Sequence, residues 1–222
     1  MLVPLLIPIF YCIKYKKEAL WDILVIAFTM ILIVIFYWPL TLEITSDANF
    51  YVKFLLFVLL PTILLFIWGK MSSKSDKNSF NWKQFGISGD GVEKSLKWGF
   101  IFLPLMLVTT FIVKYFIGNS FEANYVLGVI SFVESFTEEF FFRGVLFLFL
   151  CSKTNLKIAY VTSLASFVLM HPQNFNNLFI ISTIVQGLLT VEICRRSKNL
   201  IGAWVLHGTN RFFTIVILAF LL

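Results

Sequence analysis

The chain consists of long apolar segments separated by short polar connections. A membrane-spanning helix needs about 20 mostly apolar residues, and five segments have roughly that length or more, while three are shorter. The hydrophobic content of 59% exceeds that of ordinary soluble domains, which is about 45–50%. The sequence therefore predicts an all-α, polytopic transmembrane helix bundle with about eight membrane segments: 1–13, 20–40, 50–69, 98–117, 125–150, 158–171, 178–194 and 200–222.

Basic residues gather in every second connection. If the segments alternate across the membrane, 14 of the 18 Lys and Arg residues fall in the connections on one side. The connections on the other side, 41–49, 118–124 and 172–177, contain none. The positive-inside rule makes the basic side cytoplasmic. The net charge of +6 is thus explained by the membrane, and we expect the lipid bilayer, and no nucleic acid, as a partner.

Polar residues inside the apolar segments are concentrated in the second half of the chain. Residues 1–118 hold few of them and predict a transmembrane scaffold. Its longest polar stretch, 71–97, mixes Lys, Ser and aromatic residues and predicts an interfacial loop. Within it, GISGDG (86–91) lacks the spacing of a nucleophile elbow or a phosphate loop, so we expect a turn. Residues 119–222 are expected to form a helical core that holds whatever chemistry the chain performs.

The sequence EEFFFR places two glutamates and an arginine inside the apolar segment 125–150. An ionisable group at the bilayer centre costs about 2.5–3.5 kcal/mol on insertion scales, so such a group indicates a functional site. Glu139 and Arg143 have the i, i+4 spacing and order that favour a helical ion pair. Glu138 lies on another face, one turn after Glu134, and is expected to be unpaired and available as a general base. A purely structural polar network between helices is the alternative.

The only two histidines of the chain lie within or at the end of apolar segments. His171 precedes Pro172, which disfavours helical geometry at the histidine, so its ring is expected to line a hydrated cavity. His207 shares a helix face with Asn210, one turn later. Each histidine could instead make only an interhelical hydrogen bond. Close helix packing is expected around His207 because three small residues are nearby: Gly202, Ala203 and Gly208.

Glu138, His171 and His207 together form the two-His, one-Glu set of hydrolytic zinc sites. The amide of Asn210 is suited to stabilise an oxyanion. The same residues allow two arrangements: Zn²⁺ or another divalent metal that holds the reacting water, or a water activated directly by Glu138. The sequence does not distinguish between them.

Three motifs follow one another on successive apolar segments. EEFFFR matches EExxxR, FVLMH (167–171) matches FxxxH, and His207 with Asn210 resembles a closing His/Asn motif. Over about its last hundred residues, the chain resembles the CPBP family of intramembrane endopeptidases, which includes type II CAAX prenyl proteases and bacteriocin-processing or self-immunity proteins. The resemblance implies peptide-bond hydrolysis by a Glu-activated water, in a family classed with the metalloendopeptidases, with these catalytic residues: Glu138, Glu139, Arg143, His171, His207 and Asn210.

With its apolar segments, the chain is expected to be a multi-pass protein of the cell membrane, here the bacterial plasma membrane. Its substrate would be a membrane-associated peptide, such as a bacteriocin leader, a signalling peptide or a prenylated tail. Many relatives have Asn four residues after the last histidine, where this chain has Arg211, which we expect to snorkel or to pair with a carboxylate. The alternatives are a non-catalytic membrane regulator or self-immunity protein of the same fold and, ranked last, a small proton-coupled transporter, for which repeat symmetry between the halves is missing.

Overall fold

The computed structural model describes residues 1–43, 46–72, 81–118 and 122–221, without the side chains of 38–43, 46 and 47. Within these ranges the chain is helical and contains no strand, so the predicted all-α fold is confirmed. The helices are α1 (Leu6–Tyr15), α2 (Leu20–Glu43), α3 (Ser46–Lys53), α4 (Leu60–Ser72), α5 (Val92–Ile117), α6 (Tyr125–Glu139), α7 (Leu150–Lys153), α8 (Leu156–Leu169), α9 (Phe179–Ser197), α10 (Ile201–Phe212) and α11 (Leu218–Leu221).

Several of these helices are joined end to end by π-helical turns. The segment η3 (Phe54–Leu59) joins α3 to α4, η6 (Phe140–Phe149) joins α6 to α7, and η8 (Phe213–Ile217) joins α10 to α11. Each of the eight predicted segments therefore coincides with one helical rod. A π-helical turn rotates the following side chains relative to a regular α-helix and is often found at functional sites. In this chain η6 begins directly after Glu139.

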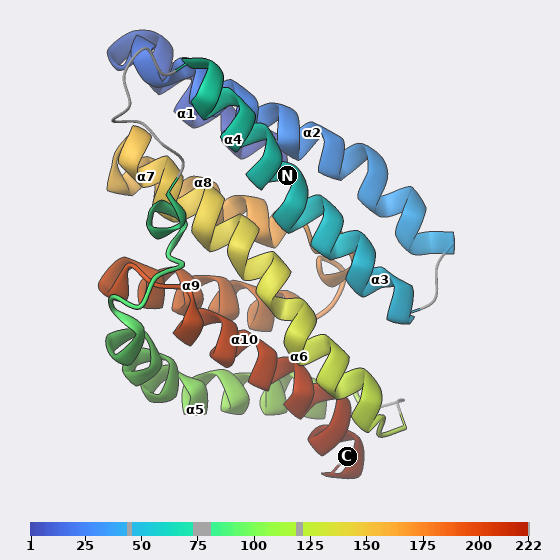
Figure 1. The fold of residues 1–222 in the computed structure, drawn as a ribbon. Coiled ribbons are helices and arrows are strands. Elements are labelled where there is room, and N and C mark those ends of the chain that lie inside the picture. Colours follow the sequence, from blue (N-terminus) through green and yellow to red (C-terminus); the bar gives the residue numbers. More distant parts are fainter. Residues whose placement is uncertain (44–45, 73–80, 119–121, 222) are drawn as a thin grey trace.

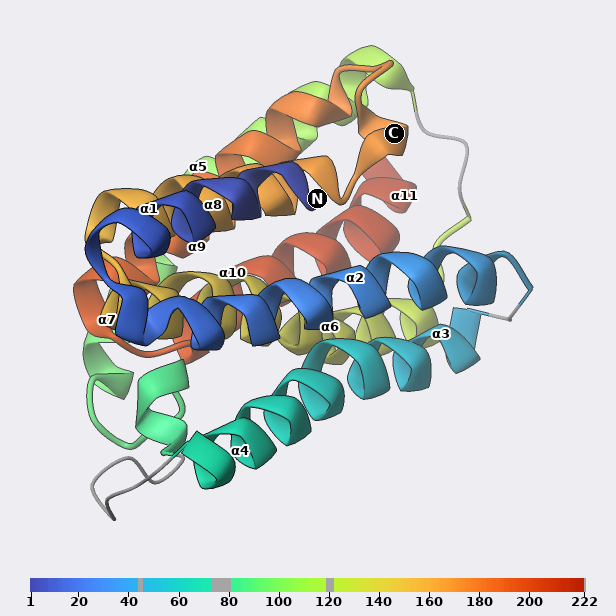
Figure 2. The ribbon, with the colours of Figure 1, turned by 90° about the horizontal axis from the view of Figure 1, so that it is seen from above.

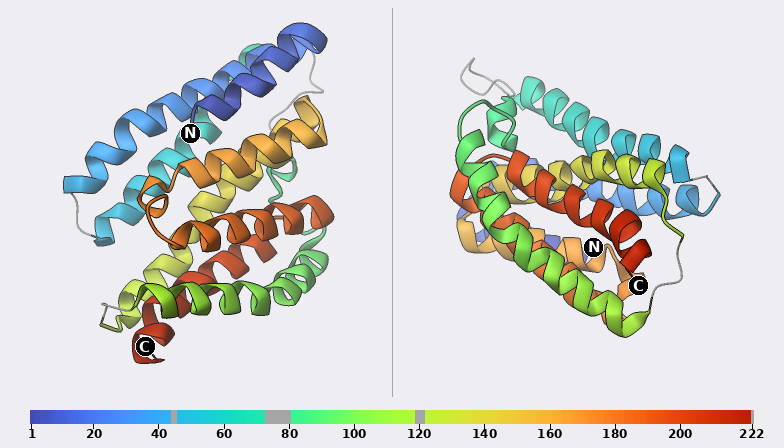
Figure 3. Two further views of the ribbon diagram at one scale, coloured as in Figure 1. Left: turned by 180° about the vertical axis from the view of Figure 1, so that it is seen from behind. Right: turned by 90° about the horizontal axis from the view of Figure 1, so that it is seen from below.

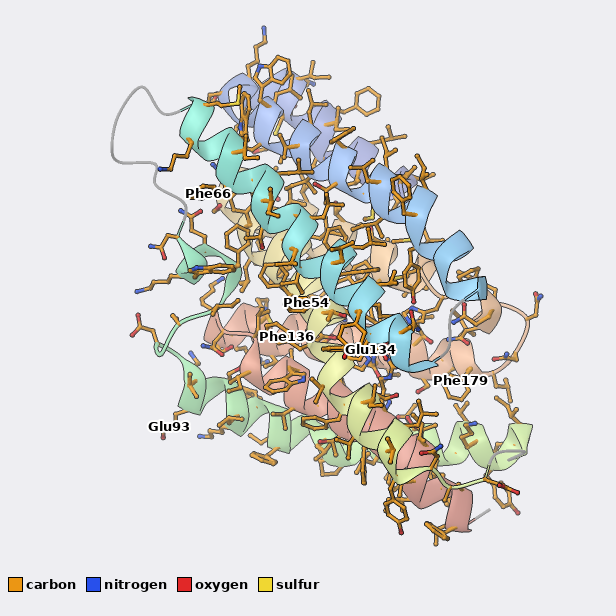
Figure 4. All side chains as sticks on the ribbon, turned by 45° about the vertical axis from the view of Figure 1, so that its right-hand side comes forward. Phe54, Phe66, Glu93, Glu134, Phe136 and Phe179 are labelled. Carbon is orange, nitrogen blue, oxygen red and sulfur yellow. The ribbon has the colours of Figure 1, made fainter. Side chains whose placement is uncertain are left out.

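Four of the described rods are long and apolar enough to cross a membrane: Lys17–Tyr37, Ala48–Ser72, Val92–Ile117 and Ile201–Leu221. The rod from α6 to α7 is also long, but it carries the charges of the EExxxR motif. Two apolar helices, Val3–Tyr15 and Leu156–Leu169, are shorter. Many large apolar side chains are exposed on the outer faces of the rods (Figure 4), as expected for contact with lipid. The molecule is a helical membrane protein.

The rod from α6 to α7 runs through the middle of the bundle (Figure 1). Residues 137–150 of this rod are all buried, which is the pattern of a helix surrounded by others. On one side of it, α10 packs against α5, α6 and α9, and on the other side α2 packs against α4. Seen from behind, α8 and α9 lie between α1 and α5 (Figure 3), and from above α8 runs beside α1 (Figure 2).

The connections lie at two opposite ends of the bundle (Figure 1). One end carries η5 (Trp82–Phe85), the turn between α7 and α8 and the turn between α9 and α10. The other end carries the end of α2, the start of α3, the end of α5 and the connection between α8 and α9. The first end holds the basic connections of the sequence, so the alternation seen in the charge pattern agrees with the arrangement of the helices.

The described part of the predicted interfacial loop is fastened to the turn between α9 and α10. Nδ2 of Asn199 donates hydrogen bonds to the carbonyl oxygens of Ser88 (2.8 Å) and Asp90 (3.1 Å), and the backbone N–H of Leu200 donates to Gly86 O (3.1 Å). GISGDG is therefore a turn, as predicted. Residues 73–80 of the loop lie outside the described residues, as do residues 119–121, at the predicted boundary between the two parts of the chain.

Two glycines bring α10 into direct backbone contact with its neighbours. A Cβ atom on Gly202 would collide with the carbonyl oxygen of Ser95 in α5, and one on Gly208 would lie 2.9 Å from the carbonyl oxygen of Phe132 in α6. The backbone N–H of Gly202 also donates to Ser95 Oγ (2.9 Å). The close packing predicted around His207 is confirmed at both positions. It fixes the helix that carries His207 and Asn210.

Candidate active site

The structure brings the predicted site residues into one region in the middle of the bundle. The rod from α6 to α7 supplies Glu138, Glu139 and Arg143, the end of α8 supplies His171, and α10 supplies His207 and Asn210. α8 ends because Pro172 follows His171, whose backbone leaves helical geometry (φ −110°, ψ 58°). In Figure 4, Glu134, one turn before Glu138, lies inside the bundle where α3 passes α6, whereas Glu93 lies at its rim.

Glu139 holds Arg143 and His207 at the same time. Its Oε2 lies 3.2 Å from Nε of Arg143, and its Oε1 lies 2.7 Å from Nδ1 of His207. Nε of Arg143 also donates to Oγ1 of Thr190 in α9 (2.8 Å). The predicted ion pair is therefore confirmed, and it has a second task. Because Nδ1 of His207 is bound to Glu139, the Nε2 atom of that ring is turned toward Glu138.

Glu138 is paired, contrary to the expectation that it is free. Its Oε1 lies 2.6 Å from Nζ of Lys53 and 3.4 Å from Nη1 of Arg211. The same two cations contact Glu134: Lys53 pairs with its Oε1, and Nη2 of Arg211 lies 3.6 Å from its Oε2. Arg211 thus pairs with carboxylates, one of the two roles expected for it.

The expectation for Glu138 was wrong because the pairing cation comes from the half of the chain that was interpreted as scaffold. Lys53 is at the end of α3 and is 4% exposed. A sequence signal for it existed. Lys53 is the single charged residue between positions 50 and 69, and it belongs to the four basic residues that lie outside the basic connections. Such a lysine inside an apolar segment is itself an indication of function.

The second oxygen of Glu138 faces both histidines. Oε2 is buried without a hydrogen-bond partner among the described residues. It lies 3.8 Å from Nε2 of His171 and 3.9 Å from Nε2 of His207. These distances exceed those of a hydrogen bond. The three atoms are nevertheless close enough for one small molecule to contact all of them.

Phe167, the first residue of the FxxxH motif, connects the three motifs. Its ring centroid lies 4.9 Å from that of His171 and 6.2 Å from that of His207. The guanidinium carbon of Arg143 lies 4.2 Å from the same centroid, a cation–π contact. The carbonyl oxygen of Phe167 is 2.9 Å from Nδ1 of His171, which leaves Nε2 of that ring facing Glu138. The sequence indicated this phenylalanine as part of a motif but did not indicate its role.

The histidines and Glu138 line a cavity of about 450 Å³. Lys53, Asn210 and Arg211 also line it. Glu139 and Arg143 do not line the cavity. Asn210 is held from two helices. Its Oδ1 accepts a hydrogen bond from Thr110 of α5 (2.8 Å), and its Nδ2 donates to Gln186 of α9 (3.0 Å). Thr110, like Lys53, belongs to residues 1–118, so the first half contributes to the site.

The formal charges around the cavity cancel when both histidines are neutral. Buried charges are tolerated when they are paired and hydrogen-bonded, and removing one partner is strongly destabilising. The cluster holds three carboxylates and three cations, which contact one another as described above: Glu134, Glu138, Glu139, Lys53, Arg143 and Arg211.

The proposed metal ligands do not fit a divalent ion in this arrangement. Across the described ranges, no three His, Cys, Asp or Glu side chains form a group that could hold a metal ion. The ammonium group of Lys53 and the guanidinium group of Arg211 already contact Glu138. A dication bound beside them would be repelled. Metal binding by Glu138, His171 and His207 therefore stays a prediction from the sequence.

Comparison with known proteins identifies the second half of the chain. Residues 120–213 match the family model described as type II CAAX prenyl endopeptidase Rce1-like. Over this segment, the chain is similar to the Rce1-like family. No curated protein and no solved structure matches the chain. The resemblance to CPBP endopeptidases is thereby confirmed over this segment, and the match supports a CAAX-type intramembrane protease at the family level.

The Rce1-like segment contains all six predicted catalytic residues. It also contains Arg211. Lys53 and Thr110 lie outside the matched residues. The contacts that these two residues make with Glu138 and Asn210 are therefore visible only in the fold of the whole chain.

Proposed function

We propose that this protein is an intramembrane endopeptidase that hydrolyses a peptide bond in a membrane-associated peptide by means of a water activated by Glu138. One observation carries the proposal. Among the described residues, Oε2 of Glu138 has no hydrogen-bond partner, although it is buried, and it faces Nε2 of His171 and of His207 across the cavity. A buried carboxylate oxygen without a partner is costly in a structural network, and it is useful for a general base.

In the proposed reaction, a water between Oε2 and the imidazoles gives a proton to Glu138 while its oxygen attacks the carbonyl carbon of the peptide. The resulting tetrahedral intermediate carries a negative oxygen. When the C–N bond breaks, the proton passes from Glu138 to the leaving amine, and the carboxylate is restored. Protein groups that stabilise the negative oxygen in a water-poor site supply a large part of the rate enhancement.

The surroundings of Glu138 suit these steps. Lys53 and Arg211 contact its Oε1, which leaves Oε2 to accept the proton. Arg211 and Asn210 line the same cavity and offer positive charge and an amide donor for the oxyanion. Arg211 is 27% exposed in its side chain, so it is the more adaptable of the two.

The alternative is a non-catalytic membrane regulator or bacteriocin self-immunity protein of the same fold. The observation that favours it is the double pairing of Glu138 Oε1 with Lys53 and Arg211. A residue needed only for structure would be held in this way. In that case, the arrangement of Oε2 and the two Nε2 atoms that face it would serve no reaction.

Glu138→Gln separates the two functions. Glu93 is exposed at the rim of the bundle, so Glu93→Gln is a control with the same chemical change. Peptide termini in membranes of cells that express each form are compared by mass spectrometry at matched protein abundance. We expect termini that depend on the wild type and on Glu93→Gln to fall by about 10²-fold or more in Glu138→Gln, the usual contribution of a general base. Unchanged termini in Glu138→Gln would refute peptidase activity.

A further inference from the structure

The catalytic cavity lies toward one end of the bundle. Its outer lining comes from the connection between α8 and α9 and from the start of α9, represented by Gln173, Asn174 and Phe179, and from Thr214 and Ile215 beyond α10. These elements meet at the end where α2 ends and α3 begins (Figure 1). Gln173 is exposed, so the cavity reaches the surface there.

The shortness of α8 leaves the cavity accessible at this end. α8 has 14 residues, which rise about 21 Å at 1.5 Å per residue. The hydrocarbon core is about 30 Å thick. Because Pro172 stops the helix, the chain turns back into α9 before it has crossed this thickness. Irregular backbone at such a depth is tolerated where it lines a water-filled cavity.

The interior toward the opposite end is closed by aromatic packing. Phe85, 1% exposed, stacks on Phe149 and on Phe140, with ring centroids 5.1 Å and 6.0 Å apart. A separate cavity of about 370 Å³ at that end is lined by polar groups such as Lys16 and Lys153, and it shares no lining residue with the catalytic cavity.

The distribution of charge tells which end faces the cytoplasm. The described parts of the connections at the closed end hold 12 of the 18 basic residues of the chain. The end with the cavity carries the connections that lack Lys and Arg altogether. By the positive-inside rule, the closed end is cytoplasmic and the cavity faces the other side.

We propose that the cavity receives its peptide from the extracytoplasmic side of the membrane. The statement rests on the proposed peptidase function, which it makes more specific: the scissile bond lies in or just outside the extracytoplasmic half of the bilayer. The substrate class is then an exported or membrane-spanning peptide that presents its chain on that side. A lipidated tail confined to the cytoplasm would meet the closed, aromatic end of the bundle.

Cysteine accessibility tests the orientation. The three native cysteines, Cys12, Cys151 and Cys194, are free and are first replaced by Ala. Into this background we introduce Asn176→Cys, in the exposed connection between α8 and α9, or Ser152→Cys, exposed near the other end of α8. Neither change alters the charge of the chain. Intact bacterial cells are treated with a membrane-impermeant maleimide before and after permeabilisation.

We expect Asn176→Cys to be labelled in intact cells and Ser152→Cys only after permeabilisation. Three outcomes would overturn the proposal. They are the reverse pattern, labelling of both cysteines in intact cells, and labelling of neither cysteine until permeabilisation. Labelling does not depend on catalysis, so Glu138→Gln added to each variant must leave the pattern unchanged. Loss of peptidase function and a wrong orientation are therefore distinguished. The termini that depend on Glu138 must, in addition, map to extracytoplasmic parts of their parent peptides.

Discussion

Oε1 of Glu139 and Nδ1 of His207 lie 2.7 Å apart, so the second glutamate of the EExxxR motif orients a histidine of the last motif. The other oxygen of Glu139 is shared with Arg143. Glu139 is fully buried and does not line the cavity. It is thus a positioning residue in the proposed reaction, and we expect its effect to pass through His207.

Glu139→Gln should reduce turnover by about tenfold or more, as is usual when a group that orients a histidine is lost. It should also destabilise the fold, because Arg143 is left without a charge partner. The double variant Glu139→Gln/Arg143→Met removes both charges and should recover abundance and melting temperature. Its turnover should stay low. Recovery of turnover together with stability would show that Glu139 matters only for folding.

Lys53→Met should destabilise the protein strongly, by about 3–5 kcal/mol, because it leaves two buried carboxylates facing one guanidinium group. The melting temperature in detergent measures the effect. Adding Glu134→Gln restores the balance of charges and should recover most of the loss, in a double-mutant cycle with a clear coupling energy. Additive effects of the two substitutions would contradict the shared network of Lys53, Glu134 and Glu138.

Peptidase activity should resist strong chelators. Lys53 and Arg211 already neutralise the carboxylate that would have to bind a divalent ion, and the described residues around it form no metal-binding group. Purified protein incubated with 1,10-phenanthroline or EDTA is compared with an untreated sample at equal concentration. Inactivation that Zn²⁺ reverses would show that Glu138, His171 and His207 rearrange into the ligand set expected from the sequence.

Gly202→Ala should lower stability by about 1–3 kcal/mol or more, the usual cost of overpacking. The added methyl group would collide with the backbone of Ser95, and neither helix can yield without moving the other. Gly89→Ala is a matched control, because a Cβ there has no atom within 4 Å. Equal melting temperatures for both variants would contradict the contact between α5 and α10.

The sequence predicted the helical segments because long apolar runs leave few other structures in a membrane. It predicted five of the six catalytic candidates because charge and histidine are rare within such runs, and it predicted Asn210 from its place one turn after His207 in the closing His/Asn motif. It could not give the partners of Glu138. Spacing along one helix defines which residues share a face, as for Glu139 and Arg143, but Lys53 is 85 positions away from Glu138. Their contact depends on how α3 packs against α6.

The same limit explains the surroundings of Asn210. Thr110 and Gln186 are ordinary polar residues in helices. Nothing in their own segments indicates that both form hydrogen bonds with the side-chain amide of Asn210. The π-helical turns of η6 could not be predicted from the sequence either, because they depend on packing around the central rod. Tertiary contacts thus decide the features that periodicity leaves open.

The contribution of Lys53 has a consequence for how such proteins diversify. The Rce1-like segment holds the reactive groups but not the ammonium group that balances them. Transplanted onto a different set of leading helices, the segment would carry an excess of negative charge into hydrocarbon. A functional recombinant therefore needs a buried cation at the place of Lys53 in its leading helices. For this reason the two halves of the chain are expected to be inherited together.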